Sequence, residues 1–180
     1  MAQTIKRIAV VLTGCGHRDS TEIHEASALI SSAYECSKEL TFFAPDFNYK
    51  VFNHYTGQET EEMRNSITES TRISRVACNK LKDLNSANFD GLMIPGGIGS
   101  FEILYEDLET KNQMTAVLQG FISNKKPVVC VCIAPKMVAK CIEESSLMTK
   151  KYKLTVGNDL SHFSDLSKII GVKTGPDVFF

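Results

Sequence analysis

The chain has 180 residues, of which 43% are apolar and 23% are charged, and its formal net charge is −1. This composition is ordinary for a globular protein, and the length suits one domain with a sizeable core, so residues 1–180 are expected to form a single domain. The balanced charge argues against a nucleic-acid or membrane-surface partner, and the apolar runs are too short to span a bilayer.

Strand and helix patterns alternate along the chain. In chain order the sequence predicts a strand over 5–13, a helix over 20–38, a strand over 39–45, a helix over 61–84, a strand over 89–95, a helix over 111–124, a strand within "KPVVCVCIA", a helix from Pro135, a strand over 153–156 and a helix near 160–169. Asp19 or Ser20 can cap the first helix.

This alternation predicts the α/β class: a three-layer α/β/α sandwich with a mainly parallel, doubly wound (flavodoxin-like) sheet. In such sheets, binding and catalytic sites form at the carboxyl ends of the strands. The residues that follow each predicted strand are therefore the candidates for function.

The stretch "VVCVCIAPKM", residues 128–137, places two cysteines near the end of a strand. Cys130 lies among apolar neighbours and is expected to pack. Cys132 lies at the junction with the next helix, whose dipole favours a thiolate, so it is expected to react below the free-thiol pKa of about 8.5. This turn from strand to helix is similar to the nucleophile elbow of hydrolases, with cysteine in place of serine. Packing is the alternative interpretation for Cys132.

Three further strand-end features point to the same edge. Gly96-Gly97 forms either a simple turn or a backbone that offers N–H groups to an anionic oxygen. Glu22 either complements the dipole of its helix or shares a proton with Cys132 as a general acid/base. Glu25, one turn away, is expected in solvent. His54 can reach this edge, although a lone loop histidine is more often structural.

Six cysteines occur at positions 15, 36, 78, 130, 132 and 141, without a C-x-x-C pair or zinc-like spacing. Reduced thiols are the expectation for such a chain. The first residues lead almost directly into an apolar run, and a signal peptide would need a longer apolar segment and a cleavage site. We therefore expect a cytoplasmic protein.

Together these segments resemble the ThiJ/PfpI superfamily of the class I glutamine amidotransferase-like fold, and more closely its ElbB branch, also called the ES-one family of glyoxalase-like proteins. The matching segments occur in the family's order over about residues 5–160: "AVVLTGCGHRDSTEIHEASALI", "FFAPD", "VFNHYTGQ", "MRNSITESTRIS", "FDGLMIPGGIGS", "KPVVCVCIAPKM" and, more weakly, "LTVGND".

The resemblance implies roles for four residues. Cys132 would be the nucleophile at the elbow, and Glu22 would be its acidic partner. Gly97 and Ile133 would offer backbone N–H groups to an oxyanion. Cys132 would attack an aldehyde carbon to form a hemithioacetal, and Glu22 would move a proton during rearrangement to a hydroxy acid.

The implied activity is a glyoxalase-like lyase reaction on small α-oxoaldehydes such as glyoxal and methylglyoxal. It would need no cofactor, metal or glutathione. Gly96 and His54 would belong to the substrate-binding region, His54 through its match to the family's "NH" segment. A homodimer is one option for the oligomeric state, which the sequence leaves open.

Three departures from the family pattern leave a second interpretation open. Ile133 follows the cysteine and His162 is the only later histidine, which argues against peptidase or glutaminase activity. The loop "GGIGSFEILYEDL" differs from the family's usual run. The chain ends at "GVKTGPDVFF", where the family continues through a strand pair and a last helix. The alternative is a non-enzymatic thiol redox or stress protein, or a shortened, catalytically impaired member.

Overall fold

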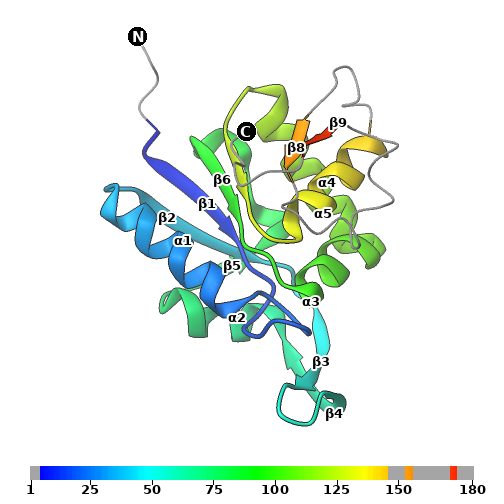
Figure 1. Cartoon of the computed structure of the whole chain (residues 1–180). Helices are drawn as coiled ribbons and strands as arrows, with labels where there is room; N and C mark the ends of the chain where they lie inside the picture. Colours follow the sequence, from blue (N-terminus) through cyan, green and yellow to red (C-terminus); the bar gives the residue numbers. More distant parts are fainter. Residues whose placement is uncertain (1–4, 146–152, 156–170, 174–180) are drawn as a thin grey trace.

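A computed structural model describes residues 5–145, 153–155 and 171–173. Its main sheet has five parallel strands: β1 (Arg7–Val11), β2 (Glu39–Ala44), β5 (Cys78–Lys80), β6 (Gly91–Ile94) and β7 (Val128–Cys130). Their order across the sheet is β5-β2-β1-β6-β7 (Figure 1).

The strand order shows that the sheet is doubly wound. From β1 the chain builds outward through β2 to β5, and then returns to the other side of β1 for β6 and β7. The two halves therefore separate between β1 and β6, which is where open α/β sheets bind ligands. The predicted doubly wound parallel sheet is confirmed, with β1 at its centre; the flavodoxin order, 2-1-3-4-5, differs in detail.

Helices cover both faces of the sheet (Figure 1), which confirms the three layers. One face packs on α1 (Ile23–Glu35) and α2 (Ser66–Ser74), and the other packs on α4 (Leu108–Ser123) and α5 (Ala134–Glu143). Strand β1 serves both layers because its side chains alternate in direction. Its side chains toward α1 are Ile8 and Val10, with Leu12 after the strand end, and those toward α4 and α5 are Ala9 and Val11.

The predicted helix over 61–84 is wrong. This region holds strand β4 (Gln58–Asn65), which pairs with β3 (Asn48–Asn53) in an antiparallel hairpin, then α2 and β5. Asn65 begins α2 because its side chain accepts the N–H groups of Ile67 and Thr68. Arg75 ends it in the left-handed conformation. The hairpin projects from the body of the molecule (Figure 1).

Other boundaries also differ from the prediction. Helix α1 is capped by Glu22, and neither Asp19 nor Ser20 caps it. After β6 a short helix, α3 (Ile98–Phe101), runs into a π-helical turn over Glu102–Glu106. The remaining short elements are 3₁₀ turns at Leu81–Asp83 and Ser86–Asn88, and strands β8 (Lys153–Thr155) and β9 (Gly171–Lys173).

The predicted strand at 153–156 corresponds to β8, but β8 pairs with β9 in a separate two-stranded sheet and does not join the main one. The helix predicted near 160–169 lies outside the described residues. Within the described part of the chain, no helix is both long and apolar enough to cross a membrane.

The loop between β1 and α1 is held by two buried threonines. Thr21 accepts the N–H of Thr13 at 2.7 Å, and the two hydroxyl oxygens are 3.0 Å apart. The carbonyl of Thr21 also accepts the N–H of Gly16 at 2.9 Å. Both threonines are fully buried, so these bonds have no water to replace them. They fix the loop, and with it the start of α1, against the end of β1.

Thr21→Val keeps the side-chain shape but leaves the N–H and hydroxyl of Thr13 without an acceptor. We expect the free energy of unfolding, measured by urea denaturation, to fall by about 1–3 kcal/mol. Thr56→Val is the control, because Thr56 is exposed at the turn of the hairpin and should change stability by less than about 0.5 kcal/mol. Equal effects of the two substitutions would contradict this account of the loop.

Candidate active site

Cys132 occupies a sharp turn between β7 and α5. Strand β7 ends at Cys130, α5 begins at Ala134, and Cys132 has φ of +55°. The other described non-glycine residues with positive φ lie one or two residues after the end of a helix, where this conformation is common: Ser37, Arg75 and Lys125. At Cys132 it costs about 1–3 kcal/mol and turns the thiol out of the strand, as a nucleophile elbow does.

Two backbone N–H groups face the sulfur of Cys132. They belong to Gly97, after β6, and to Ile133, the next residue in the chain, and both stabilise a negative charge on the sulfur. The structure therefore brings together three of the predicted site residues, Cys132, Gly97 and Ile133. Their arrangement can hold an anion formed at or next to the sulfur.

The carboxylate beside the thiol belongs to Glu25. Its side chain hydrogen-bonds to Cys132, and its Oε2 accepts the N–H of Gly96 at 2.8 Å. Glu25 is half-buried, so its expected exposure to solvent is wrong. Helix α1 begins three residues later than predicted, at Ile23, and this shift moves Glu25 into the first turn of the helix, against the sheet edge.

Glu22 lies at the N-cap of α1 and makes no described contact with Cys132. Its Oε2 accepts the N–H of Glu25 at 2.7 Å, and its Oε1 bonds Nδ1 of His24 at 2.7 Å. Partial burial acts to raise the pKa of Glu22, but the bonds from His24 and Glu25 outweigh it and lower the pKa below its ordinary value. The prediction that Glu22 is the partner of the thiol is corrected to Glu25.

Gly96 allows Glu25 and Cys132 to approach each other. A Cβ atom built on Gly96 would lie 2.6 Å from Cβ of Cys132 and 2.6 Å from Oε2 of Glu25. Gly97, with φ of +114°, would place a Cβ 2.2 Å from the carbonyl oxygen of Ser20. Both glycines are thus required by close packing of the β6 turn against the loop before α1 and the turn at Cys132.

The pKa of the Cys132 thiol is raised, which contradicts the expected acidic thiol. Although the residue is exposed, the surrounding protein removes enough water from the sulfur to raise its pKa, and the hydrogen bond and charge of Glu25 add to this effect. The N–H groups of Gly97 and Ile133 act in the opposite direction but do not outweigh it. The raised pKa favours a protonated thiol at Cys132, hydrogen-bonded to the side chain of Glu25.

His54 lies on the hairpin, away from these contacts. Its ring packs edge-on against Phe52, with centroids 5.4 Å apart, and its Nε2 accepts the N–H of Arg18 at 3.5 Å. In the described part of the chain, no hydrogen bond or ring contact joins His54 to Cys132 or Glu25. A role for His54 in binding substrate stays a prediction.

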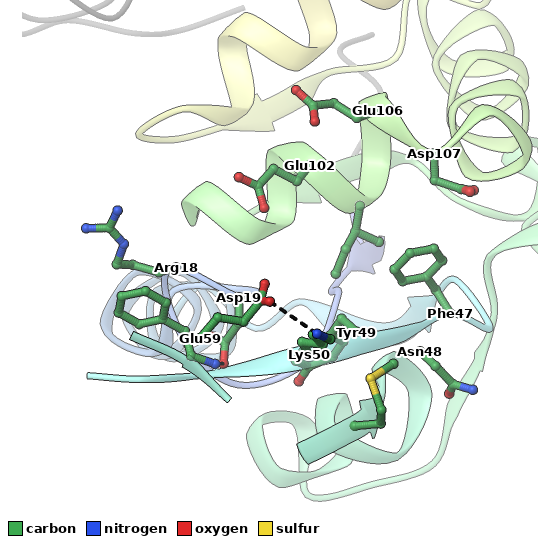
Figure 2. Close-up of a pocket in the computed structure, with 13 residues that line it drawn as sticks. Arg18, Asp19, Phe47, Asn48, Tyr49, Lys50, Glu59, Glu102, Glu106 and Asp107 are labelled. Atoms are coloured by element: carbon green, nitrogen blue, oxygen red, sulfur yellow. Dashed lines mark hydrogen bonds and ion pairs between the residues drawn. The ribbon is translucent and has the colours of Figure 1, made fainter. Parts of the chain in front are cut away.

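A cavity of about 450 Å³ lies between the loop after β1, the hairpin and the π-helical turn (Figure 2). Asp19 joins two of its walls, because its carboxylate accepts the N–H of Phe52 at 2.9 Å. Burial, and then the charge of Glu106, raise the pKa of Glu102 on the opposite wall. Cys132 does not line this cavity, so the cavity is separate from the thiol site. Among the described residues no cluster of His, Cys, Asp and Glu side chains could hold a metal ion.

The chain is similar to curated proteins of three vertebrates. It is 38% identical over 161 residues to the rat ES1 protein homolog, mitochondrial, and 37% identical over 161 residues to the human glutamine amidotransferase-like class 1 domain-containing protein 3, mitochondrial. Each match covers 85% of this chain and 58% of the relative. The chain therefore spans less than two thirds of the length of these proteins.

The names of these relatives correct the expected localisation. The rat and human proteins are mitochondrial, and so is the zebrafish ES1 protein, which is 30% identical over 147 residues. The expectation of a cytoplasmic protein, based on the first residues of the chain, is therefore wrong.

Solved structures and a family model agree with the fold. An isoprenoid biosynthesis protein with an amidotransferase-like domain from Ehrlichia chaffeensis aligns with a TM-score of 0.84 and 29% identity, covering 95% of this chain and 79% of its own. The DJ-1/PfpI family model matches residues 26–155. The predicted ThiJ/PfpI resemblance is confirmed: this chain belongs to the DJ-1/PfpI family and is homologous to the ES1 proteins.

Proposed function

We propose that this protein is a cysteine-dependent enzyme that converts small α-oxoaldehydes, such as glyoxal and methylglyoxal, into hydroxy acids. The observation that carries the proposal is the grouping of a nucleophile, a base and two oxyanion donors around one point. These are the thiol of Cys132, the carboxylate of Glu25, and the N–H groups of Gly97 and Ile133. The proposal keeps the chemistry expected from the sequence but gives the proton-transfer role to Glu25.

In the first step the sulfur of Cys132 bonds to an aldehyde carbon of glyoxal, and Glu25 takes the thiol proton. The carbonyl oxygen becomes an oxyanion next to the N–H groups of Gly97 and Ile133, which stabilise its charge. Return of the proton from Glu25 to this oxygen gives a neutral hemithioacetal. The raised pKa of the thiol is compatible with this step, because deprotonation accompanies attack.

In the second step Glu25 removes the proton from the carbon bonded to sulfur, which gives an enediolate, and then delivers this proton to the neighbouring carbon. The hydroxyl proton on the carbon bonded to sulfur moves to the oxygen of the neighbouring carbon, which leaves a thioester and an alcohol. One carbon is thereby oxidised to a thioester and the other reduced to an alcohol, so no external oxidant or reductant is needed. Water then hydrolyses the thioester, which releases glycolate and restores the thiol of Cys132. The net reaction adds one water molecule to glyoxal.

A solved structure of a glyoxalase shares the fold of this chain. A glyoxalase III from Candida albicans aligns with a TM-score of 0.56 and 12% identity, which shows a shared fold only. The amidotransferase-like names of other relatives suggest a different reaction. Ile133 occupies the position after the nucleophile here, and no described histidine bonds Cys132, so we favour the aldehyde reaction. Members of the family are often dimers, and we propose that this chain also forms a homodimer.

The first test is formation of glycolate from glyoxal by the purified protein, followed by NMR. Cys132→Ser removes the nucleophile and Glu25→Gln removes the base, so each should lower turnover by at least about 100-fold. Glu35→Gln, at the exposed end of α1, is the control for Glu25→Gln. Full turnover by either site variant would refute the mechanism.

Cys130→Ala tests whether Cys130 serves packing alone while Cys132 is the nucleophile. Cys130 is 3% exposed and packs in the core, so its truncation should lower the free energy of unfolding by about 1 kcal/mol while turnover is retained. A loss of turnover in a stably folded Cys130→Ala protein would show that the wrong thiol has been assigned.

The pH dependence of alkylation at Cys132 tests the state of the thiol. Burial and the carboxylate of Glu25 both disfavour the thiolate, so the midpoint measured by site-resolved mass spectrometry should lie above that of a free cysteine peptide. Glu25→Gln removes the negative charge and should lower the midpoint. A midpoint below that of the peptide would favour the alternative function, a redox-sensing thiolate.

A further inference from the structure

The first turn of α1 resembles a capping box, but one of its two hydrogen bonds is replaced by bonds to Gly96. In the usual box the N-cap side chain accepts the N–H of residue N3, and the N3 side chain accepts the N–H of the N-cap. Here Glu22 is the N-cap and Glu25 is N3, and the first of these bonds is present at 2.7 Å. The second bond is absent between them.

Gly96 bonds both groups that the missing second bond would have joined, the N–H of Glu22 and the side chain of Glu25. The N–H of Glu22 donates to the carbonyl oxygen of Gly96 at 3.0 Å, and the N–H of Gly96 donates to Oε2 of Glu25 at 2.8 Å. Together with the bond from Glu25 N–H to Glu22 Oε2, these contacts form a closed ring of three hydrogen bonds. The ring ties the first turn of α1 to Gly96, two residues after β6 and beside Cβ of Cys132.

From this ring we infer that Glu22 is a positioning residue, whose carboxylate holds the backbone of Glu25 so that the Glu25 side chain stays against Cys132. The Glu22 side chain is 15% exposed and has both oxygens engaged, by Glu25 and by His24. Glutamate is not among the common N-cap residues, which are shorter. Its length here lets one carboxylate cap the helix and also bond His24, whose side chain is 92% exposed.

The inference separates the roles of two carboxylates that are one turn apart. Glu25 touches the thiol, whereas Glu22 acts through Glu25 and needs only a hydrogen-bond acceptor at its end. An uncharged acceptor of the same length should therefore replace Glu22. The positioning role of Glu22 rests on the proposed function only for its effect on turnover, because its effect on the thiol of Cys132 is measurable without any substrate.

The test is the alkylation midpoint of Cys132 in Glu22 variants. Glu22→Ala frees the Glu25 side chain from the thiol, so the midpoint should fall by about 0.5 pH unit or more, in the direction of Glu25→Gln. Glu22→Gln keeps the acceptor and should retain the wild-type midpoint. Glu22→Gly also removes the acceptor but costs little helix stability, so it gives the same reading if the alanine variant does not fold.

Two controls decide the interpretation. Asp107→Ala removes an equivalent N-cap from α4, where Asp107 accepts the N–H of Thr110 at 2.8 Å, and should lower the melting temperature without moving the midpoint. In a Glu25→Gln background, Glu22→Ala should cause no further shift.

Three results would overturn the inference: a wild-type midpoint in Glu22→Ala and Glu22→Gly, a shift in Glu22→Gln equal to that in Glu22→Ala, or additive shifts in the double variant. Failure of the proposed function has a different signature. In that case glycolate formation is absent from the wild-type protein, while the shifts of the alkylation midpoint follow the order given above.

Discussion

The site depends on the two hydrogen bonds that the backbone of Gly96 makes with the start of α1. The N–H and the carbonyl of Gly96 both bond the first turn of α1, so a segment from the middle of the chain completes a helix start near its beginning. The contact has no room for a side chain, because a Cβ atom would collide with Cys132 and with the Glu25 carboxylate. The thiol, the carboxylate and the N–H groups of Gly97 and Ile133 are thereby held in one arrangement by backbone packing.

The doubly wound topology explains why these segments meet. Strand β1 lies at the centre of the sheet with β6 beside it, so the loop before α1 and the turn at Gly96-Gly97 leave the sheet at the same edge. Strand β7 adds Cys132 from the next position along that edge. The buried pair Thr13–Thr21 fixes the loop, and the apolar layers pack on the two faces of the sheet.

The electrostatics of the site favour a protonated thiol at rest. A partly desolvated sulfur beside a carboxylate loses its proton less readily, and the left-handed backbone at Cys132 adds local strain that the surrounding packing must offset. A base in direct contact removes the need for a permanently ionised thiol, because the proton can move as the new bond forms. This arrangement supports the proposed role of Cys132 as a nucleophile rather than as a redox-sensing thiolate.

Local pattern in the sequence was enough to predict the α/β class, most strands of the sheet and the position of Cys132, because apolar periodicity and the strand–Pro-helix junction are encoded by neighbouring residues. It also indicated Gly97 and, through the family resemblance, Ile133. It assigned the acidic partner to Glu22 and expected Glu25 in solvent, and a shift of the helix start by three residues exchanges these environments. The hairpin was missed because Met63 and Ile67 fit a helical spacing across a boundary that only the cap at Asn65 defines. Tertiary structure decided which carboxylate meets the thiol, because that choice depends on a bond to Gly96, 71 residues away in the chain.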